Sequence, residues 1–198
     1  ESKQDPNRQQ PHEDTASAWD RVYAAQVLES SPTVFLRPGE TGRGFRSLYG
    51  KYMDGATFIY VQAPYIATER GLMRLAQFLS VVHAFPSVAC VCVETDGHSK
   101  ELPAATRQLR AEWLQHGVDL QFSCTPGLHY RCMWYAHADF CWKVEVDRGI
   151  DHLRYGPLDL EPETARSLTT KIQATRVAAT AGELQELIAS PVLPHACL

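Results

Sequence analysis

Histidines stand two positions before a basic residue at more than one place in this chain. His98 precedes Lys100 in this way, and His129 precedes Arg131. On a strand, such spacing puts both side chains on one face. An imidazole that attacks phosphorus, beside a cation that holds the phosphate oxygens, suits phosphoryl transfer. His98 falls in a polar loop, where a histidine is more often simply solvated, so the candidates for chemistry are His129 and Arg131.

The stretch Ser123–Tyr155 is also rich in residues of the types that bind zinc. The candidate ligands are Cys124, Cys132, His137 and Cys141. Cysteine and histidine are the usual zinc ligands, and short gaps between them can close a tetrahedral site. The pattern lacks a Cys-x2-Cys pair, and the alternative is a hairpin that carries scattered buried cysteines. We expect neither a metal nor another cofactor.

Arginines supply a third set of candidates, because guanidinium groups bind phosphate through two parallel hydrogen bonds. One cluster follows the turn that begins at Asp147, and the other surrounds the first expected helix of the domain. The candidates are Arg148 and Arg154 in the first cluster, and Arg37, Arg43, Arg46 and Lys51 in the second. The alternative is a solvated surface with local ion pairs, for example between Arg148 and Asp147 or Asp151.

Composition limits the classes of protein that the chain can represent. Its 198 residues favour one domain with appendages, and 44% hydrophobic with 21% charged residues is ordinary for a globular protein. The net charge of -4 makes a nucleic-acid partner a poor expectation. Six scattered cysteines predict a reducing, cytoplasmic setting. No apolar run approaches the roughly 18 residues of a membrane span. The start at Glu1 suggests part of a larger protein.

The elements that would position these residues alternate between strand and helix. The expected strands are 33–37, 57–62, 88–94 and 118–123, and the expected helices are 18–29, 45–53, 67–85, 103–116, 162–172 and 180–189. Two more strands, 130–136 and 139–146, would form a hairpin. Thr68 is the expected cap of the longest helix. This order predicts an α/β fold: a layered mixed sheet with helices on both faces and a C-terminal hairpin.

Several short motifs occur in an order that resembles the phospholipase-D-like C-terminal domain of the MIT-domain-containing protein family, which is associated with ESCRT-III and cytokinesis. They run over about residues 33–173. The matching segments are Ser47–Asp54, Gln62–Ile66, His129–Arg131, Trp142, Asp147–Asp151 and Leu158–Leu160. We therefore divide the chain into a polar linker with a short helix at 1–30, a phospholipase-D-like domain at 31–175, and a C-terminal helix and tail at 176–198.

Departures from the pattern of catalytic phospholipase D bear on activity. An active half-site has a lysine two positions after its histidine and then, after four intervening residues, an aspartate; here these positions hold Arg131 and Ala136, with Asp139 the nearest carboxylate. Active enzymes also need two half-sites, and this chain shows one at most. The resemblance implies a domain that keeps the fold and has lost the hydrolase, with His129 vestigial.

The resemblance also implies binding to membranes or phosphoinositides, and homodimerisation. We expect a noncatalytic, cytoplasmic or peripheral membrane module whose phosphate contacts come from Arg131 and Arg148, with Arg154, Arg43 and Arg46 as further candidates. One alternative is a protein-interaction scaffold that acts through a dimer face or through Trp134 and Tyr135 of the hairpin. A further alternative is a phosphodiesterase in which each of two chains supplies one His129.

Overall fold

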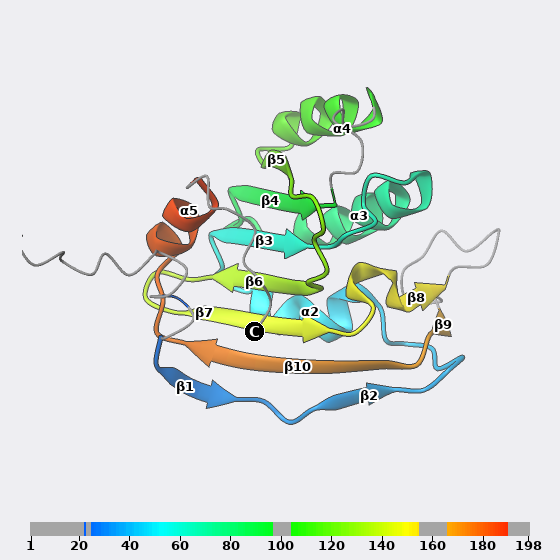
Figure 1. Cartoon of the computed structure of the whole chain (residues 1–198), viewed down its shortest axis with the longest axis vertical. Coiled ribbons are helices and arrows are strands. Elements are labelled where there is room, and N and C mark those ends of the chain that lie inside the picture. Colours follow the sequence, from blue (N-terminus) through cyan, green and yellow to red (C-terminus); the bar gives the residue numbers. More distant parts are fainter. Residues whose placement is uncertain (1–21, 23–24, 97–103, 155–165, 190–198) are drawn as a thin grey trace, which may run out of the picture.

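A mixed sheet organises the part of the chain that the structure describes, which is Val22 and residues 25–96, 104–154 and 166–189 of a computed structural model (Figure 1). Within these residues eight strands form the main sheet, in the spatial order β1-β10-β7-β6-β3-β4-β5, with β2 also paired to β10. The strands are β1 Val27–Ser30, β2 Val34–Leu36, β3 Phe58–Gln62, β4 Cys90–Thr95, β5 Asp119–Cys124, β6 Cys132–Ala136, β7 Cys141–Val146 and β10 Thr170–Val177. A small second sheet pairs β8, Leu153–Arg154, with β9, Arg166–Ser167.

The sheet has a parallel part and an antiparallel part. Strands β3, β4 and β5 run parallel, and β6, β7 and β10 run antiparallel to their neighbours. Parallel strands are normally buried on both faces, and all five residues of β3 are buried. The hairpin expected near residues 130–146 is the β6–β7 pair, so the predicted mixed sheet with a hairpin is confirmed.

Helices cover both faces of the sheet, as expected. Three of them contribute to one core with the first face of the sheet: α2 Phe45–Met53, α3 Glu69–Val82 and α4 Ala104–Gln115. Helix α5, Ala181–Ala189, packs on the second face through Leu184. Thr68 caps α3 as predicted, because its side chain accepts a hydrogen bond from the Gly71 N–H. None of the described helices is long and apolar enough to cross a membrane.

One expected helix is wrong where the structure describes it, and another is wrong at its end, since Val22 is helical as expected but the segment continues into a strand. In the segment 162–172, the described residues form β9 and the start of β10; in the segment 18–29, Val27–Ser30 is β1. Strand β10 alternates buried and more accessible side chains, the pattern of a strand with unlike faces. It lies between β7 on one side and β1 and β2 on the other. These pairings satisfy its backbone groups, and this long-range context overrides the local helical spacing.

The turn after β7 is fixed by a buried histidine. This turn contains a short 3-10 helix, η1, Gly149–His152. The Nδ1 of His152 lies 2.8 Å from Gly149 O, and its Nε2 lies 3.3 Å from the Tyr49 hydroxyl. The ring packs edge-on against Phe45 and Tyr49 of α2. Burial lowers the pKa of His152 to about 4, so the ring is neutral near pH 7. The turn that follows Asp147 is thereby anchored to the first core.

Candidate phosphate site

A row of side chains crosses the second face of the sheet where the parallel strands end. Cross-strand pairing places Gln173, Glu145, Cys132, Gln62 and Glu94 opposite one another in that order, on β10, β7, β6, β3 and β4. Residues that pair in this way have side chains on the same face. Helix α5 packs toward the other end of these strands (Figure 1). The row therefore lies on a part of the second face that α5 does not cover.

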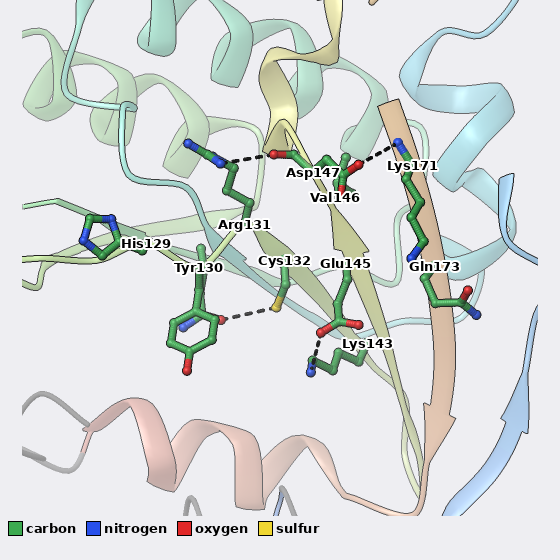
Figure 2. Close-up of a pocket in the computed structure, with 11 residues that line it drawn as sticks. His129, Tyr130, Arg131, Cys132, Lys143, Glu145, Val146, Asp147, Lys171 and Gln173 are labelled. Carbon is green, nitrogen blue, oxygen red and sulfur yellow. Dashed lines mark hydrogen bonds and ion pairs between the residues drawn. The ribbon is translucent and has the colours of Figure 1, made fainter. Parts of the chain in front are cut away.

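A pocket of about 420 Å³ opens over this row (Figure 2). Its lining combines polar and charged side chains from β3, β6, β7 and β10, from the segment before β6 and from the turn after β7. The lining residues are Gln62, His129, Tyr130, Arg131, Cys132, Lys143, Glu145, Val146, Asp147, Lys171 and Gln173. The volume is in the range of small-molecule sites, although the polar lining is unlike that of most such pockets. The character of the lining favours a charged ligand.

Arg131 is held at the pocket by the turn after β7. Its Nη1 donates a hydrogen bond to the Asp147 carbonyl oxygen at 3.1 Å. Gly149 has a φ of +57°, and a Cβ placed there would lie 3.6 Å from Arg131 Cβ, so the turn and the arginine stem are in close contact. The guanidinium carbon lies 5.7 Å from the centroid of the Tyr65 ring. The guanidinium forms no ion pair with a described residue, so it remains able to bind an anion.

The other two cations of the pocket have different surroundings. Lys143 Nζ forms an ion pair with Glu145 Oε1 at 2.9 Å and lies 5.7 Å from the centroid of the Trp134 ring. Lys171 is exposed, and its backbone N–H donates to Asp147 Oδ2 at 3.2 Å. Figure 2 shows its side chain extending along β10 toward Gln173. As with Arg131, no described carboxylate pairs with the Lys171 ammonium.

His129 lines the same pocket, but nothing described orients its ring. It is exposed, and its imidazole takes part in no hydrogen bond with a described residue. The loop before it is nevertheless fastened to β4: Thr125 Oγ1 donates to Glu94, and the Gly127 N–H donates to Asp96 Oδ1 at 3.0 Å. An effective histidine nucleophile or base is normally oriented by a third group. His129 has a defined loop but lacks such a partner in the described residues.

The floor of the pocket is a connected hydrogen-bond network. Gln62 Nε2 donates to Glu94 Oε2 at 2.9 Å, and the Tyr60 hydroxyl donates to the same oxygen. The Cys132 thiol donates to Gln62 Oε1 at 3.2 Å. Burial raises the pKa of Cys132 to about 12, so the thiol is neutral near pH 7. This cysteine acts as part of the floor.

The structure does not bring the four zinc candidates together. Cys132 begins β6, whereas Cys141 pairs with Ala136 at the far end of that strand. Four residues of extended strand separate these two positions by about 13 Å. The Cys141 thiol donates to Ala179 O, and His137 Nε2 lies 3.1 Å from Tyr52 O. No group of three or more metal-binding side chains occurs in the described part of the chain.

Of the predicted arginines, Arg131 lines the pocket, and the other five, Arg37 among them, do not. Arg148 Nε donates to Thr169 O at 3.0 Å, and Arg43 Nε pairs with Glu40 Oε1 at 3.0 Å. Arg154 lies in β8, and Arg46 lies on α2, which packs on the other face. The candidates His98 and Lys100 lie outside the described residues.

The structure differs from the expectations for two aromatic residues of β6 and for two lysines of the pocket. Trp134 and Tyr135, expected as a partner-binding surface, are both fully buried, one in each core, so that expectation is wrong. The two lysines of the pocket were missed. The alternation of Lys143, Val144 and Glu145 indicates that the two charged residues share a face. Only the strand register reveals that Lys171 joins them.

Comparison with known proteins gives one finding of similarity. A family model described as phospholipase D-like domain at C-terminus of MIT matches residues 42–180. This range includes the pocket residues and the strands that carry them. No curated protein matches the chain at a significant level.

Proposed function

This chain belongs to the family of phospholipase D-like domains at the C-terminus of MIT, and on that premise we propose that it is a noncatalytic module that binds the phosphate of a membrane lipid. The observation that carries the proposal is the open pocket in which Arg131 and Lys171 stand without carboxylate partners among the described residues. Phosphate oxygens accept strong hydrogen bonds from such cations.

The His129 ring has no hydrogen-bond partner among the described residues, and this supports a noncatalytic role. The position where an active half-site has its aspartate holds Ala136, which is buried at the far end of β6. Asp139 lies beyond it, in the turn between β6 and β7. Strand β6 alone puts about 13 Å between its two ends, too far for either position to orient His129. Proton transfer requires heavy atoms within hydrogen-bond reach, or one bridging water.

Localised charge explains how an acidic protein could bind an anionic surface. The whole chain has a net charge of -4, which opposes such binding. Each basic residue near an anionic membrane contributes about 1 kcal/mol. Two or three cations gathered at one pocket can therefore supply a salt-sensitive affinity for an anionic membrane, although the net charge of the whole chain is negative. The setting that suits this function is a cytoplasmic membrane surface.

Flotation with anionic vesicles tests this function. We expect the chain to float with vesicles at low salt and to be released as salt rises, because exposed charges are screened. Arg131→Ala and Lys171→Ala should each lower the constant for partition onto the vesicles, by about fivefold for a loss of about 1 kcal/mol. Arg107→Ala on α4 is the matched control, since that arginine is exposed and outside the pocket. Binding that neither pocket variant reduces would contradict the proposal.

A scaffold for self-association or a protein partner is the second candidate, supported by the apolar edge of the sheet. Four side chains on β1 and β2 are exposed: Val27, Leu28, Val34 and Phe35. Exposed apolar edge strands are templates for pairing with another chain. A concentration-dependent increase in solution mass that Phe35→Ser abolishes would favour this candidate. Homodimerisation and association with ESCRT-III are further proposals from the family resemblance. The resemblance also implies phosphoinositides, but the two carboxylates of the pocket lining oppose a headgroup with several phosphates.

A further inference from the structure

We propose that the pocket recognises a phosphate ester that carries an ammonium group, the chemistry of an aminophospholipid headgroup. The inference rests on the proposed phosphate-binding function and names the class of ligand. It depends on Glu145, a carboxylate in the middle of the site. A pocket that selected its ligand by negative charge alone would gain nothing from a carboxylate in that position.

The register of the sheet places Glu145 at the centre of the pocket floor. It lies on β7, opposite Cys132 of β6 and opposite Gln173 of β10. Its side chain is 56% exposed. Lys143 occupies one carboxylate oxygen, Oε1, at 2.9 Å. The other oxygen accepts no hydrogen bond from a described residue, so it can receive a donor from a ligand.

The charges of the lining favour a ligand of mixed charge. Three cations and two carboxylates give the pocket a net charge of +1 with histidine neutral. Arg131 and Lys171 are available to phosphate oxygens, while Glu145 is available to an ammonium. A headgroup with several phosphates would instead bring most of its negative charge close to Glu145 and Asp147. Like charges at such distances oppose binding.

Exposed aromatic side chains next to the pocket favour a lipid surface as the source of this headgroup. Phe35 on β2 pairs with Lys171 on β10, so both side chains lie on the pocket face. Phe35 is 70% exposed, and Tyr130, in the lining, is 46% exposed. Exposed apolar groups beside a polar site mark surfaces that bind proteins or membranes. A phospholipid offers both a headgroup for the pocket and an apolar layer for Phe35.

Nuclear magnetic resonance titration of the full chain with O-phosphoethanolamine and glycerol 3-phosphate tests the assignment. Simple charge attraction predicts that glycerol 3-phosphate, the more anionic ligand, binds more tightly. We expect the opposite for the wild type, which should bind phosphoethanolamine more tightly than glycerol 3-phosphate. Glu145→Gln should weaken binding of phosphoethanolamine and strengthen binding of glycerol 3-phosphate, each by about two- to fivefold, the range of an exposed ion pair. Glu112→Gln, at an exposed position on α4, should change neither affinity.

The outcomes separate this inference from the function on which it rests. If Glu145→Gln strengthens binding of both ligands, Glu145 merely competes with anions; the ammonium assignment is then wrong, but the phosphate site stands. If neither ligand perturbs the residues of the pocket, both proposals fail. Binding to vesicles of phosphatidylcholine with and without phosphatidylserine then identifies whether the headgroup comes from a lipid or from a soluble molecule. Vesicle binding that requires phosphatidylserine and that Glu145→Gln reduces supports a lipid bilayer as the source of the headgroup. Binding of the soluble headgroup without binding to vesicles overturns the lipid assignment.

Discussion

At the scale of single residues, Glu94 connects the floor of the pocket to the loop that carries His129. Its carboxylate accepts hydrogen bonds from Tyr60, Gln62 and Thr125. The tyrosine is buried, and burial together with the neighbouring carboxylate raises its pKa well above the ordinary value, so the hydroxyl keeps its proton and remains a donor. Three donors on one carboxylate fix the positions of β3, β4 and the loop relative to one another.

Replacing Glu94 by glutamine should therefore destabilise the fold and loosen the loop. The new amide NH2 would face a group that donates a hydrogen bond to the carboxylate oxygen in the wild type. That largely buried donor would then lack an acceptor. The expected loss is about 1–3 kcal/mol in the free energy of unfolding, measured by urea denaturation. Glu112→Gln serves as the exposed control and should stay within about 0.5 kcal/mol of the wild type. Equal stabilities of the two variants would contradict this account of Glu94.

Residue spacing identified part of the site, and strand register was needed for the rest. His129 and Arg131 are separated by one residue, so a local pattern suffices to find them. Lys143 and Lys171 are far apart in the chain and meet only because β7 and β10 pair. Arg148 was expected at the site, yet it binds a backbone carbonyl of Thr169 instead. Local sequence carries little information about such pairings.

At the scale of elements, helix α3 begins in direct contact with the chain that leaves β3. A Cβ added at Gly71 would lie 2.1 Å from the carbonyl oxygen of Tyr65 and 2.7 Å from the Cα of Ile66. These neighbours are backbone atoms, so they cannot move aside as a flexible side chain could. The same segment presents Tyr65 to Arg131. The position of α3 is thus coupled to one wall of the site.

Two glycine-to-alanine substitutions test this contact against helix propensity. In a helix interior, alanine is favoured over glycine by about 1 kcal/mol. Gly71→Ala should nevertheless lower the melting temperature, because steric overlap outweighs that gain and costs about 1–3 kcal/mol or more. Gly182→Ala in α5 meets only the Thr180 hydroxyl, at 3.9 Å, and should raise stability or leave it unchanged. A stabilised Gly71→Ala variant would show that the helix can shift without cost.

Hydrophobic periodicity correctly predicted elements whose apolar residues face the core of the folded protein. Helix α2 was expected at residues 45–53, and it occupies Phe45–Met53 because its apolar face meets the core. The strands β1 and β10 were mistaken for helices or helix segments. β1 is short and exposed along its whole length, so its sequence carries no alternation. Its conformation depends on pairing with β10.

At the scale of the whole molecule, the first core depends on a histidine that must stay neutral. His152 has an unfolded-state pKa near 6.5 and a folded-state pKa of about 4. The unfolded chain therefore binds the extra proton first as pH falls. Stability from this group is complete above about pH 6.5 and is lost as pH falls toward 4, by roughly 2 kcal/mol at pH 5.

Urea denaturation at pH 7 and pH 5 measures this loss. His152→Asn keeps a side-chain N–H for Gly149 O but cannot titrate in this range. It should be less stable than the wild type at pH 7, because the edge-on contacts with Phe45 and Tyr49 are lost. Its further loss between pH 7 and pH 5 should be smaller by roughly 2 kcal/mol. Identical pH dependence in both proteins would exclude His152 as the sensitive group.

The position of β10 has a consequence for how the protein is made. Among the described strands, β1 and β2 pair with β10 alone, and β2 ends at Leu36 whereas β10 begins only at Thr170. During synthesis on the ribosome, β1 and β2 therefore emerge long before the strand that receives them. Until β10 has been made, the backbone groups of β1 and β2 have no strand with which to pair. A chain that stalls before Thr170 would keep this edge exposed, and such unpaired strands are where aggregation and chaperone capture begin.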